Sequence, residues 1–558
     1  MMAPSENLPP RESAASAERA VADVVAETWP GGMGPPVVLL GGSRGERVAA
    51  LLAGPLRGNR QPIVVVLPLE AEPAHHASVL LGEWANFDAE RVRVVVAEDP
   101  SDALDRVFRD HAPPRLRGAT VVSGDARLPD ELFERWRSRL QRRHDDETDL
   151  LSRKHGRFRS IVATRHAHPR PRTIFGAADG STTALRHLGV DIVRAANRID
   201  IAGDFLVLDH LRDPFRPVRR LEALLDAAPD LLLSFVASRQ RDWGAIAEGI
   251  PTLSYWSSDP GRYGLDTMRF TADDLVCVSD AAWVEHFARR GVPAHHLPLA
   301  TCLHDALPCA YGLTAPEPQD AKVLLVGNLP SPLDVLPRSM HGLGPAIDRL
   351  VERDADRPDW SAADAARTLA ASERIEAGEL SLVTRAIEFA ATRHDRIRAA
   401  RLLFDAGVPL RIHGCPRWAE ALAGTPVAAC WAGLLADRRA SAIAFRTALA
   451  VVNLVSRNGR DGVNMRVFDA AACGAVLATN DTPGLHAAFD VGREVLAFRT
   501  VDELPDLLRP VLADPSRRAA IRCAGAARAR RDHTWEERLE RVIGWLAERS
   551  GHAGRAVA

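Results

Sequence analysis

The stretch that decides the fold is residues 451–499, VVNLVSRNGRDGVNMRVFDAAACGAVLATNDTPGLHAAFDVGREVLAFR. It begins with an apolar run that ends at Asn453, which is typical of a buried strand. A polar loop over 456–462 follows, and the spacing then predicts a helix over about 464–474 before a second apolar strand. Strand, loop, helix, strand units build parallel sheets, in which ligands bind where the carboxyl ends of strands meet the amino ends of helices.

Two carboxylates and one guanidinium lie at the start of this predicted helix. Asp461 precedes the helix, Asp469 lies inside it with seven residues between the two, and Arg466 shares a helix face with Asp469. A helix amino terminus favours a diphosphate, to which Arg466 adds a bidentate cation and Asn464 and Met465 add backbone amides. Asp469 is then placed to accept hydrogen bonds from ribose hydroxyls. In the alternative interpretation, Asp461 caps the helix, and Arg466 and Asp469 form a solvated pair on its surface.

A set of short segments carries a resemblance to a known family. They are NMRVFDAAACGAVLATND at 464–481, Gly484-Leu485, Phe489, Gly492-Arg493-Glu494 and HTWEERLERV at 533–542. This pattern resembles the CgeB-like glycosyltransferases over about residues 322–546. Residues 255–260, YWSSDP, and the stretch 274–300 are similar to the amino-terminal half of that family.

The resemblance implies a fold and an activity. Proteins of this family are similar to GT-B glycosyltransferases, which have two facing Rossmann-like domains and bind the nucleotide-sugar donor on the carboxyl-terminal one. In related retaining enzymes, two Glu residues separated by seven positions contact the donor. Asp461 and Asp469 stand at that spacing here, each one methylene shorter than Glu. The resemblance thus implies that both contact the donor, and it suggests retention of anomeric configuration.

Length and charge exclude several function classes. The 558 residues suggest roughly three or four domains at about 150 residues each. The net charge of −2 gives no overall field that would attract nucleic acid, and no segment reaches the roughly 18 uninterrupted apolar residues of a membrane span. We therefore expect a cytoplasmic enzyme that binds no nucleic acid and has no integral membrane segment. The acidic residues 1–34 are predicted to be a disordered tail and not a secretory signal.

Cysteine and lysine usage narrows the chemistry. The seven cysteines have no CxxC spacing, which argues against a disulfide framework and a structural zinc site. Lysine occurs only at 154 and 322, so arginine supplies nearly all of the 71 basic residues. Anion binding must therefore depend on arginine and backbone amides. We expect no metal and no cofactor beyond the donor substrate.

The pattern of apolar runs predicts an α/β protein with a small α/β module at its start. The resemblance implies that the rest of the chain is a GT-B-like pair of Rossmann-type domains, one for the acceptor and one for the donor. The expected parts are an accessory module at 35–150, a linker at 151–171, an acceptor domain at 172–315, a donor domain at 320–530 with an insertion at 329–380, and a final helix at 531–549 that crosses back to the acceptor domain. The expected strands of the first two domains are 37–40, 63–67, 92–96, 120–123, 173–175, 191–193, 231–236, 252–256, 275–278 and 296–299, with helices at 181–188 and 281–290.

Further candidate residues follow other predicted strands. Asp259 lies in the loop after the strand at 252–256, where it either acts as a base on the acceptor hydroxyl or closes an Asp-Pro turn. Gly327 and Asn328 form a small turn after the strand at 323–326 that either admits donor phosphates or serves the backbone alone. His413 ends the strand at 410–413 and faces either the core or the nucleotide base.

Two other motifs are weaker. Residues 41–45, GGSRG, follow the first strand and form either a bare turn or a contact to a phosphate or an S-adenosylmethionine-like cofactor. Asp354-Ala355-Asp356 resembles a DxD metal motif, although a charged solvent-exposed loop is its simpler setting.

We thus predict a metal-independent sugar transfer from a nucleoside-diphosphate sugar to a hydroxyl of a protein or glycan, such as a bacterial surface structure. Arg466 and Asp259 are the candidate catalytic residues. Two alternatives stay open: a nucleotide-sugar-binding scaffold protein that does not transfer, and a two-function protein whose first module is methyltransferase-like.

Overall fold

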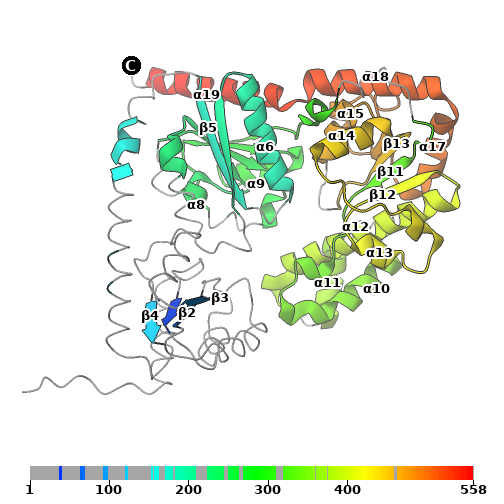
Figure 1. Cartoon of the computed structure of the whole chain (residues 1–558), viewed down its shortest axis with the longest axis horizontal. Coiled ribbons are helices and arrows are strands. Elements are labelled where there is room, and N and C mark those ends of the chain that lie inside the picture. Colours follow the sequence, from blue (N-terminus) through cyan, green and yellow to red (C-terminus); the bar gives the residue numbers. More distant parts are fainter. Residues whose placement is uncertain are drawn as a thin grey trace, which may run out of the picture. The chain divides into compact units, whose positions relative to one another are not determined.

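A computed structural model gives the fold of the chain (Figure 1). It describes residues 170–556 except 180–182, 209–222, 244–248, 263–264, 266–267, 309–317, 358–359, 374 and 458–460, and before them 37–40, 63–68, 92–97, 120–123, 138, 142, 153–154 and 156–161. The chain divides into two compact units, residues 1–167, 177–186 and 205–229 in one and residues 168–176, 187–204 and 230–558 in the other. Every side-chain contact described below lies within the second unit.

The first sheet consists of four parallel strands in the order β3-β2-β1-β4. Its strands are β1 (Val37–Leu40), β2 (Ile63–Pro68), β3 (Val92–Ala97) and β4 (Thr120–Ser123). The apolar runs of the sequence predict each of these four strands to within one residue. The glycine-rich segment 41–45 lies outside the described residues.

The second sheet has six strands in the order β10-β9-β8-β7-β5-β6, and it is parallel from β5 to β10. Its elements are β5 (Thr173–Asp179), α6 (Thr183–Arg198), β6 (Ala202–Leu208), β7 (Leu231–Phe235), α8 (Arg239–Trp243), β8 (Thr252–Trp256), η3 (Pro260–Arg262), β9 (Asp274–Val278), η5 (Ala281–Trp283), α9 (Val284–Ala288) and β10 (Ala294–His296). Strands β7, β8 and β9 are buried along their whole length, as expected for a sheet covered on both faces.

Two local predictions in this domain are wrong. The expected strand at 191–193 lies inside helix α6, because Leu188, Ile192 and Ala195 repeat at helical spacing and form one buried face. The expected strand at 296–299 begins earlier, as β10, and ends at its first predicted residue. The β-branched pair Ile192 and Val193 favoured a strand locally, but helical burial overrides that preference.

The third sheet consists of five parallel strands in the order β12-β11-β13-β14-β15 (Figure 1). Its strands are β11 (Val323–Val326), β12 (Leu410–His413), β13 (Ala450–Asn453), β14 (Leu477–Asn480) and β15 (Leu496–Phe498). The covering helices are α13 (Arg417–Ala421), α14 (Arg438–Thr447), α15 (Met465–Ala472), α16 (Pro483–Ala488), α17 (Leu504–Ala513) and α18 (Pro515–Asp532), with η11 (Pro426–Cys430) and η12 (Val501–Glu503) between them.

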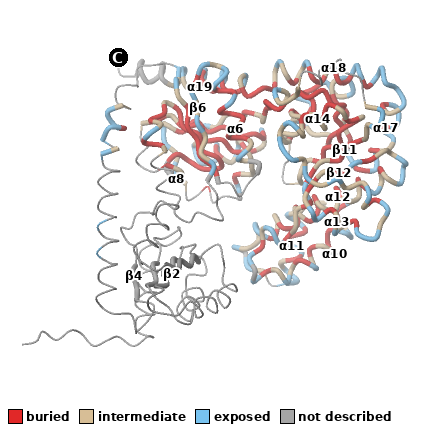
Figure 2. The backbone as a smooth tube through the Cα atoms, in the orientation of Figure 1, coloured by how far each residue is buried: buried red, intermediate tan, exposed pale blue. Residues whose placement is uncertain are grey.

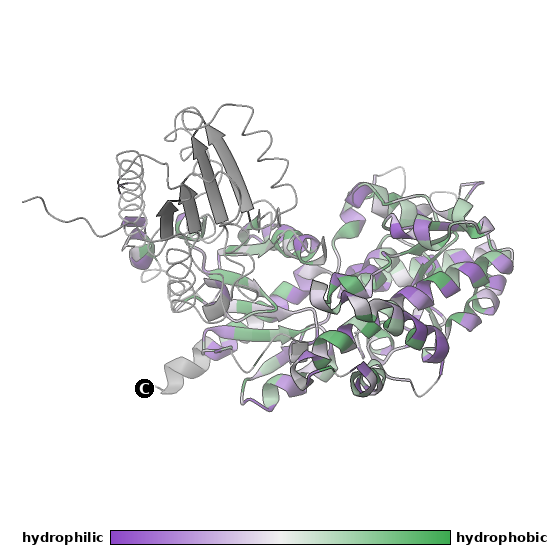
Figure 3. Ribbon diagram, turned by 90° about the horizontal axis from the view of Figure 1, so that it is seen from below, coloured by the Kyte–Doolittle hydropathy of each residue, from purple (hydrophilic) through white to green (hydrophobic). Residues whose placement is uncertain are grey.

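Alternation along β11 shows how this sheet is built. Leu324 packs on one face against α14 and α15, whereas Val323 and Leu325 pack on the other against α12 and α17. Both faces are therefore apolar, and the strands are buried (Figure 2). Hydrophobic residues accordingly follow the strands and the inner faces of the helices (Figure 3). Two parallel α/β sheets of this kind confirm the predicted pair of Rossmann-type domains.

The segment 329–380 forms a helical insertion with its own core. Its elements are η8 (Pro332–Asp334), η9 (Arg338–Leu343), α10 (Gly344–Asp354), α11 (Ala362–Glu373) and η10 (Ala377–Glu379), and they precede α12 (Leu380–Asp405). Helix α12 joins the two parts, because Ala386 and Ile387 pack with α10 and α11, whereas Ala399 and Leu403 pack under the third sheet.

The last helix, α19 (Trp535–Ala556), lies against the β5–β10 domain (Figure 1). The ring of Trp535 meets that of Tyr255 edge-on at 5.7 Å, and Trp545 stacks on His295 at 4.3 Å. Further along, the guanidinium of Arg549 donates to the carbonyl of Asp274 at 2.9 Å. None of the described helices combines the length and apolar character that crossing a membrane requires.

Candidate functional site

Asn453 organises the carboxyl edge of the third sheet. It is fully buried at the end of β13, opposite Thr479 of β14, and its Nδ2 donates to the hydroxyl of Thr479 at 3.0 Å. Its Oδ1 accepts from Arg466 Nη1 at 3.0 Å and from Asn464 Nδ2 at 3.2 Å. Asn453 therefore fixes the guanidinium that the sequence predicts as the anion contact. The sequence identifies Asn453 only as the end of an apolar run.

A second guanidinium, that of Arg396 on α12, lies at the same edge. It is 7% exposed, and it donates to the carbonyl of Asn328 and, at 3.2 Å, to the carbonyl of Leu454. A Cβ at Gly327 would lie 3.0 Å from Arg396 Nε, so glycine leaves room for this side chain. The Nε itself has no hydrogen-bond partner among the described residues. Sequence reasoning missed Arg396, because its partners Asn328 and Leu454 lie 68 and 58 positions away in the sequence.

The two guanidiniums place two positive charges close together, and no carboxylate among the described residues pairs with either. Burial lowers the pKa of Arg466, and the carboxylate of Asp469 opposes this shift. Burial and then the charge of Arg466 lower the pKa of Arg396 to about 9. Among the described residues neither forms an ion pair with a carboxylate, whereas the nearby Arg457 is paired with Asp395 through two bonds of 2.7 Å. Buried cations without counter-ions are costly, and a bound anion would stabilise them.

The loop before α15 carries Asp461. The amide of Gly484 donates to the carbonyl of Asp461 at 2.6 Å, and the amides of Asp461 and Gly462 donate to the carboxylate of Asp280 at 3.1 Å and 2.9 Å. The Asp461 carboxylate itself has no hydrogen-bond or ion-pair partner within the described part of the chain. The N-cap of α15 is Asn464, so the alternative in which Asp461 caps the helix is wrong.

Replacement of Gly484 by alanine is expected to distort this loop. A Cβ there would lie 2.4 Å from the carbonyl oxygen of Asp461, which is backbone and cannot rotate away. We expect Gly484→Ala to lower the free energy of unfolding by about 1–3 kcal/mol, as for other overpacked sites. Chemical denaturation measures this loss, with Gly378→Ala as a control, since a Cβ at Gly378 would meet no atom within 4 Å and its φ is not positive. Equal stability of Gly484→Ala and wild-type protein would contradict the close approach.

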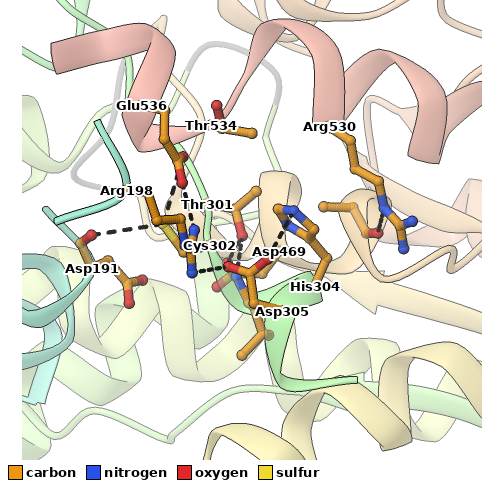
Figure 4. Close-up of polar contacts among 12 residues, drawn as sticks. Asp191, Arg198, Thr301, Cys302, His304, Asp305, Asp469, Arg530, Thr534 and Glu536 are labelled. Carbon is orange, nitrogen blue, oxygen red and sulfur yellow. Dashed lines mark hydrogen bonds and ion pairs between the residues drawn. The ribbon is translucent and has the colours of Figure 1, made fainter. Parts of the chain in front are cut away.

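Asp469 lies on α15 but meets a different partner from the one predicted. Its Oδ1 accepts from the hydroxyl of Thr301 at 2.5 Å, in the segment that follows the second sheet (Figure 4). Burial, and next the charge of Asp191, raise the pKa of Asp469 to about 7. Asp469 and Arg466 form no ion pair, so the interpretation as a solvated pair is wrong. The predicted contact of Asp469 with ribose stays a prediction.

A cluster of charges surrounds Asp469 and joins the two α/β domains (Figure 4). Asp191 of α6 forms an ion pair with Arg438, the first residue of α14. Burial raises the pKa of Asp191 to about 6, although Arg438 opposes the shift. Beside it, Arg198 forms ion pairs with Asp305 and with Glu536 of α19. The members lie far apart in the sequence, so no local motif marks this cluster.

Asp259 closes the turn after β8. Its Oδ1 accepts from the amide of Gly261 at 2.9 Å and lies 3.8 Å from Nε2 of His286. These contacts are those of the Asp-Pro turn interpretation. A role for Asp259 as the base for an acceptor hydroxyl stays a prediction.

The backbone amide and carbonyl of Gly327 both form hydrogen bonds within the protein. Its amide donates to the carbonyl of His413 at 2.9 Å, and its carbonyl accepts from Trp418 Nε1 at 2.7 Å. A Cβ at Gly414 would lie 2.2 Å from the Gly327 carbonyl oxygen, so both glycines serve close packing. The ring of His413 contacts the carbonyl of Gly433 at 3.2 Å, and burial lowers its pKa.

The remaining predicted residues lie near the same edge. Asn328 is exposed, and its Oδ1 accepts from the amide of Cys415 at 3.0 Å. Met465 is the first residue of α15. Asn464 keeps a buried Oδ1 that has no partner among the described residues. The structure thus brings Asn328, Asn464, Met465 and Arg466 together with Arg396, and it places Asp469 against Thr301.

The Asp354-Ala355-Asp356 motif is held by arginines. Asp354 forms ion pairs with Arg353 and Arg357, and Asp356 with Arg398. Among the described residues, no three His, Cys, Asp or Glu side chains group closely enough to hold a metal ion.

Comparisons with known proteins agree with a sugar-transfer domain. Residues 393–544 match the model of a family described as glycosyl transferase-like. This match confirms the predicted glycosyl transferase-like domain and supports the assignment of the chain as a glycosyltransferase. No curated protein is similar enough in sequence to count as a relative.

Several solved structures are similar to part of this chain. A glycosyltransferase from Rickettsia africae ESF-5 is 8% identical with a TM-score of 0.40, and the similarity covers 68% of this chain and 98% of that one. Sucrose-phosphate synthase from Thermosynechococcus elongatus is 13% identical, with a TM-score of 0.37 and coverage of 69% and 99%. The Anabaena protein HepE in complex with UDP-glucose is 12% identical, with a TM-score of 0.37 and coverage of 67% and 99%.

Proposed function

We propose that the chain transfers a sugar from a nucleoside-diphosphate donor to a hydroxyl group, with the diphosphate bound by Arg466 and Arg396. The observation that supports this proposal is the pair of guanidiniums at the carboxyl edge of the third sheet, which lack carboxylate partners among the described residues. A diphosphate supplies the missing negative charge, and guanidiniums bind it through paired, charge-assisted hydrogen bonds. Asn464, whose buried Oδ1 has no partner among the described residues, is placed to accept a hydrogen bond from a hydroxyl of the nucleotide sugar.

We propose that the same two guanidiniums also stabilise the departing diphosphate during the reaction. Negative charge accumulates on the diphosphate as the bond to the sugar breaks, and cations already in place stabilise that charge without rearrangement. Two guanidiniums supply what a divalent metal ion supplies in other transferases, so we propose a metal-independent reaction. Asn453 contributes indirectly, because it holds Arg466 by a bond of 3.0 Å.

The finer assignment rests on the sequence. The segments at 464–481 and 533–542 favour a CgeB-like enzyme that retains anomeric configuration. We propose that the β5–β10 domain binds an acceptor protein or glycan, such as a bacterial surface structure, with Asp259 as the candidate base. We propose a cytoplasmic enzyme that uses a nucleotide sugar as its donor and needs neither a cofactor nor nucleic acid.

A panel of nucleotide sugars tests this function. The full chain is incubated with UDP-glucose, GDP-mannose and dTDP-rhamnose in the presence of EDTA, and the released nucleoside diphosphate is measured together with the thermal shift. We expect one donor to raise the Tm and to be turned over by transfer or slow hydrolysis. Binding without any turnover supports the alternative of a non-catalytic nucleotide-sugar-binding protein, which the engagement of Asp469 with Thr301 favours. No binding of any donor contradicts both.

A further inference from the structure

We infer that Asp280, a residue of the β5–β10 domain, positions the loop that presents Asp461 to the donor sugar. Asp280 follows β9 and is 2% exposed. One of its carboxylate oxygens, Oδ1, accepts from the amide of Ala282 at 3.0 Å and caps η5 in its own domain. This inference rests on the proposed function, because it assigns a role within the donor site.

The other carboxylate oxygen of Asp280 reaches the donor domain. It accepts from the amide of Asp461 at 3.1 Å and from that of Gly462 at 2.9 Å. A Cβ at Gly462 would lie 3.2 Å from this oxygen. The absence of a side chain at Gly462 therefore lets the Asp280 carboxylate come close to the loop. Bonds from amides to a charged carboxylate are about twice as strong as neutral ones. A single buried carboxylate therefore joins the first turn of η5 to the loop before α15.

These contacts fix the backbone of Asp461 from two sides. Asp280 binds its amide, and the amide of Gly484 binds its carbonyl at 2.6 Å. The side chain, in contrast, has no hydrogen-bond or ion-pair partner among the described residues and remains partly exposed. A carboxylate on a rigid backbone, with its own acceptor oxygens unused, is arranged to bind hydroxyl groups of a ligand. The direction of the Asp461 carboxylate thus depends on a residue of the opposite domain.

The position of Asp280 also allows its carboxylate to compete with a phosphate of the nucleotide sugar. The experiment must distinguish this competition from the positioning of Asp461. The Asp280 carboxylate accepts hydrogen bonds from two backbone amides just before α15. A phosphate group of the nucleotide sugar would also accept hydrogen bonds from amides at this place. If Asp280 only competed with the phosphate, its removal would tighten donor binding. If Asp280 positions Asp461, its removal weakens the binding of the sugar and leaves the binding of the diphosphate almost unchanged.

The test uses the full chain as wild type, Asp280→Ala, Asp461→Asn and the double variant. The donor is whichever of UDP-glucose, GDP-mannose and dTDP-rhamnose gives the largest thermal shift, and UDP, GDP or dTDP is its sugar-free counterpart. For Asp280→Ala we expect the KM for the nucleotide sugar to rise by about tenfold and the Kd for the nucleoside diphosphate to change by less than about twofold. In the Asp461→Asn background, Asp280→Ala should add less than about a twofold effect, because both changes act on one contact.

Asp274→Asn is the matched control. Asp274 lies at the other end of β9, is 3% exposed, and accepts from the amides of Arg239 at 2.7 Å and Thr271 at 2.8 Å within its own domain. We expect it to lower stability without a selective change in the KM for the nucleotide sugar. The inference is overturned if Asp280→Ala binds the nucleotide sugar as tightly as wild type or more tightly, or if its effect adds in full to that of Asp461→Asn.

Hydrogen exchange separates this inference from the proposed function. In wild-type protein the amides of Asp461 and Gly462 should be protected, and in Asp280→Ala they should exchange at least about tenfold faster. If the wild type binds none of the three nucleotide sugars, the proposed function fails, and the exchange result alone decides whether Asp280 holds the loop. Equal exchange in the two proteins would overturn the positioning role.

Discussion

Replacement of Arg466 by alanine is expected to lower kcat by about 100- to 1000-fold, which corresponds to roughly 3 kcal/mol of transition-state stabilisation. The reason is geometric, since Asn453 holds this guanidinium at the edge of the sheet that we propose binds the diphosphate. Stability should change little, because the loss of the buried hydrogen bond is offset by relief of the repulsion with Arg396. Steady-state kinetics with saturating donor, together with thermal unfolding, measures both quantities.

Arg522→Ala provides the control for this variant. Arg522 is another buried arginine of the same domain, 6% exposed, and it donates to the carbonyl of Ala448. We expect its replacement to lower stability while the folded protein keeps its kcat. If Arg466→Ala lost stability and activity in parallel, as a structural residue would, the role of Arg466 at the diphosphate would be contradicted.

Replacement of Asp469 by asparagine is expected to stabilise the protein above neutral pH. The folded pKa of Asp469 is raised to about 7 from 3.8, chiefly by burial. Below pH 3.8 both the folded and the unfolded chain hold the proton, and no stability is lost. Between pH 3.8 and about 7 only the unfolded chain ionises, so stability falls by about 1.4 kcal/mol per pH unit. Above pH 7 the loss is complete and amounts to a few kcal/mol, on the order of 4 at most.

Asparagine keeps the acceptor for Thr301 and carries no charge, so the advantage of Asp469→Asn should grow from pH 4 to pH 7 and then level off. Differential scanning fluorimetry across this range, at constant ionic strength, follows the difference in Tm. Asp405→Asn serves as the control, since Asp405 is exposed and forms no ion pair among the described residues. An advantage of Asp469→Asn that is the same at pH 5 and pH 8 would be incompatible with a buried, protonated carboxyl group.

Local periodicity predicts the elements of this chain where burial and spacing agree. The unit from β13 to β14 follows from the apolar run that ends at Asn453 and from the glycine at 474, which has a positive φ of 78° and ends α15. The same approach fails at 191–193, where β-branched residues lie in a helix. Sequence spacing also places Arg466 correctly at the start of α15, because that placement depends only on the helical repeat.

The parts of the site that sequence reasoning misses are those made by distant segments. Thr301 and Asp469 are separated by 168 positions, and Asp280 and Asp461 by 181. Arg396 reaches the edge of the third sheet from α12, a helix that packs both with the insertion and under that sheet. The spacing of residues within a single helix or strand cannot predict such contacts between distant segments. The resemblance to a family predicts which residues are functional, but it does not predict that Asp469 contacts Thr301.

We propose that Arg466 and Arg396 bind a diphosphate at one edge of the third sheet. Calorimetric titration tests this proposal most directly. The nucleoside diphosphate released in the donor screen is titrated into wild-type protein, Arg396→Met and the control Arg522→Met, with the corresponding nucleoside as a phosphate-free ligand. We expect the affinity of Arg396→Met for the diphosphate to fall by about 10- to 100-fold, while the control behaves as wild type and the nucleoside binds all three proteins equally weakly. An unchanged Kd for the diphosphate in Arg396→Met would contradict the claim.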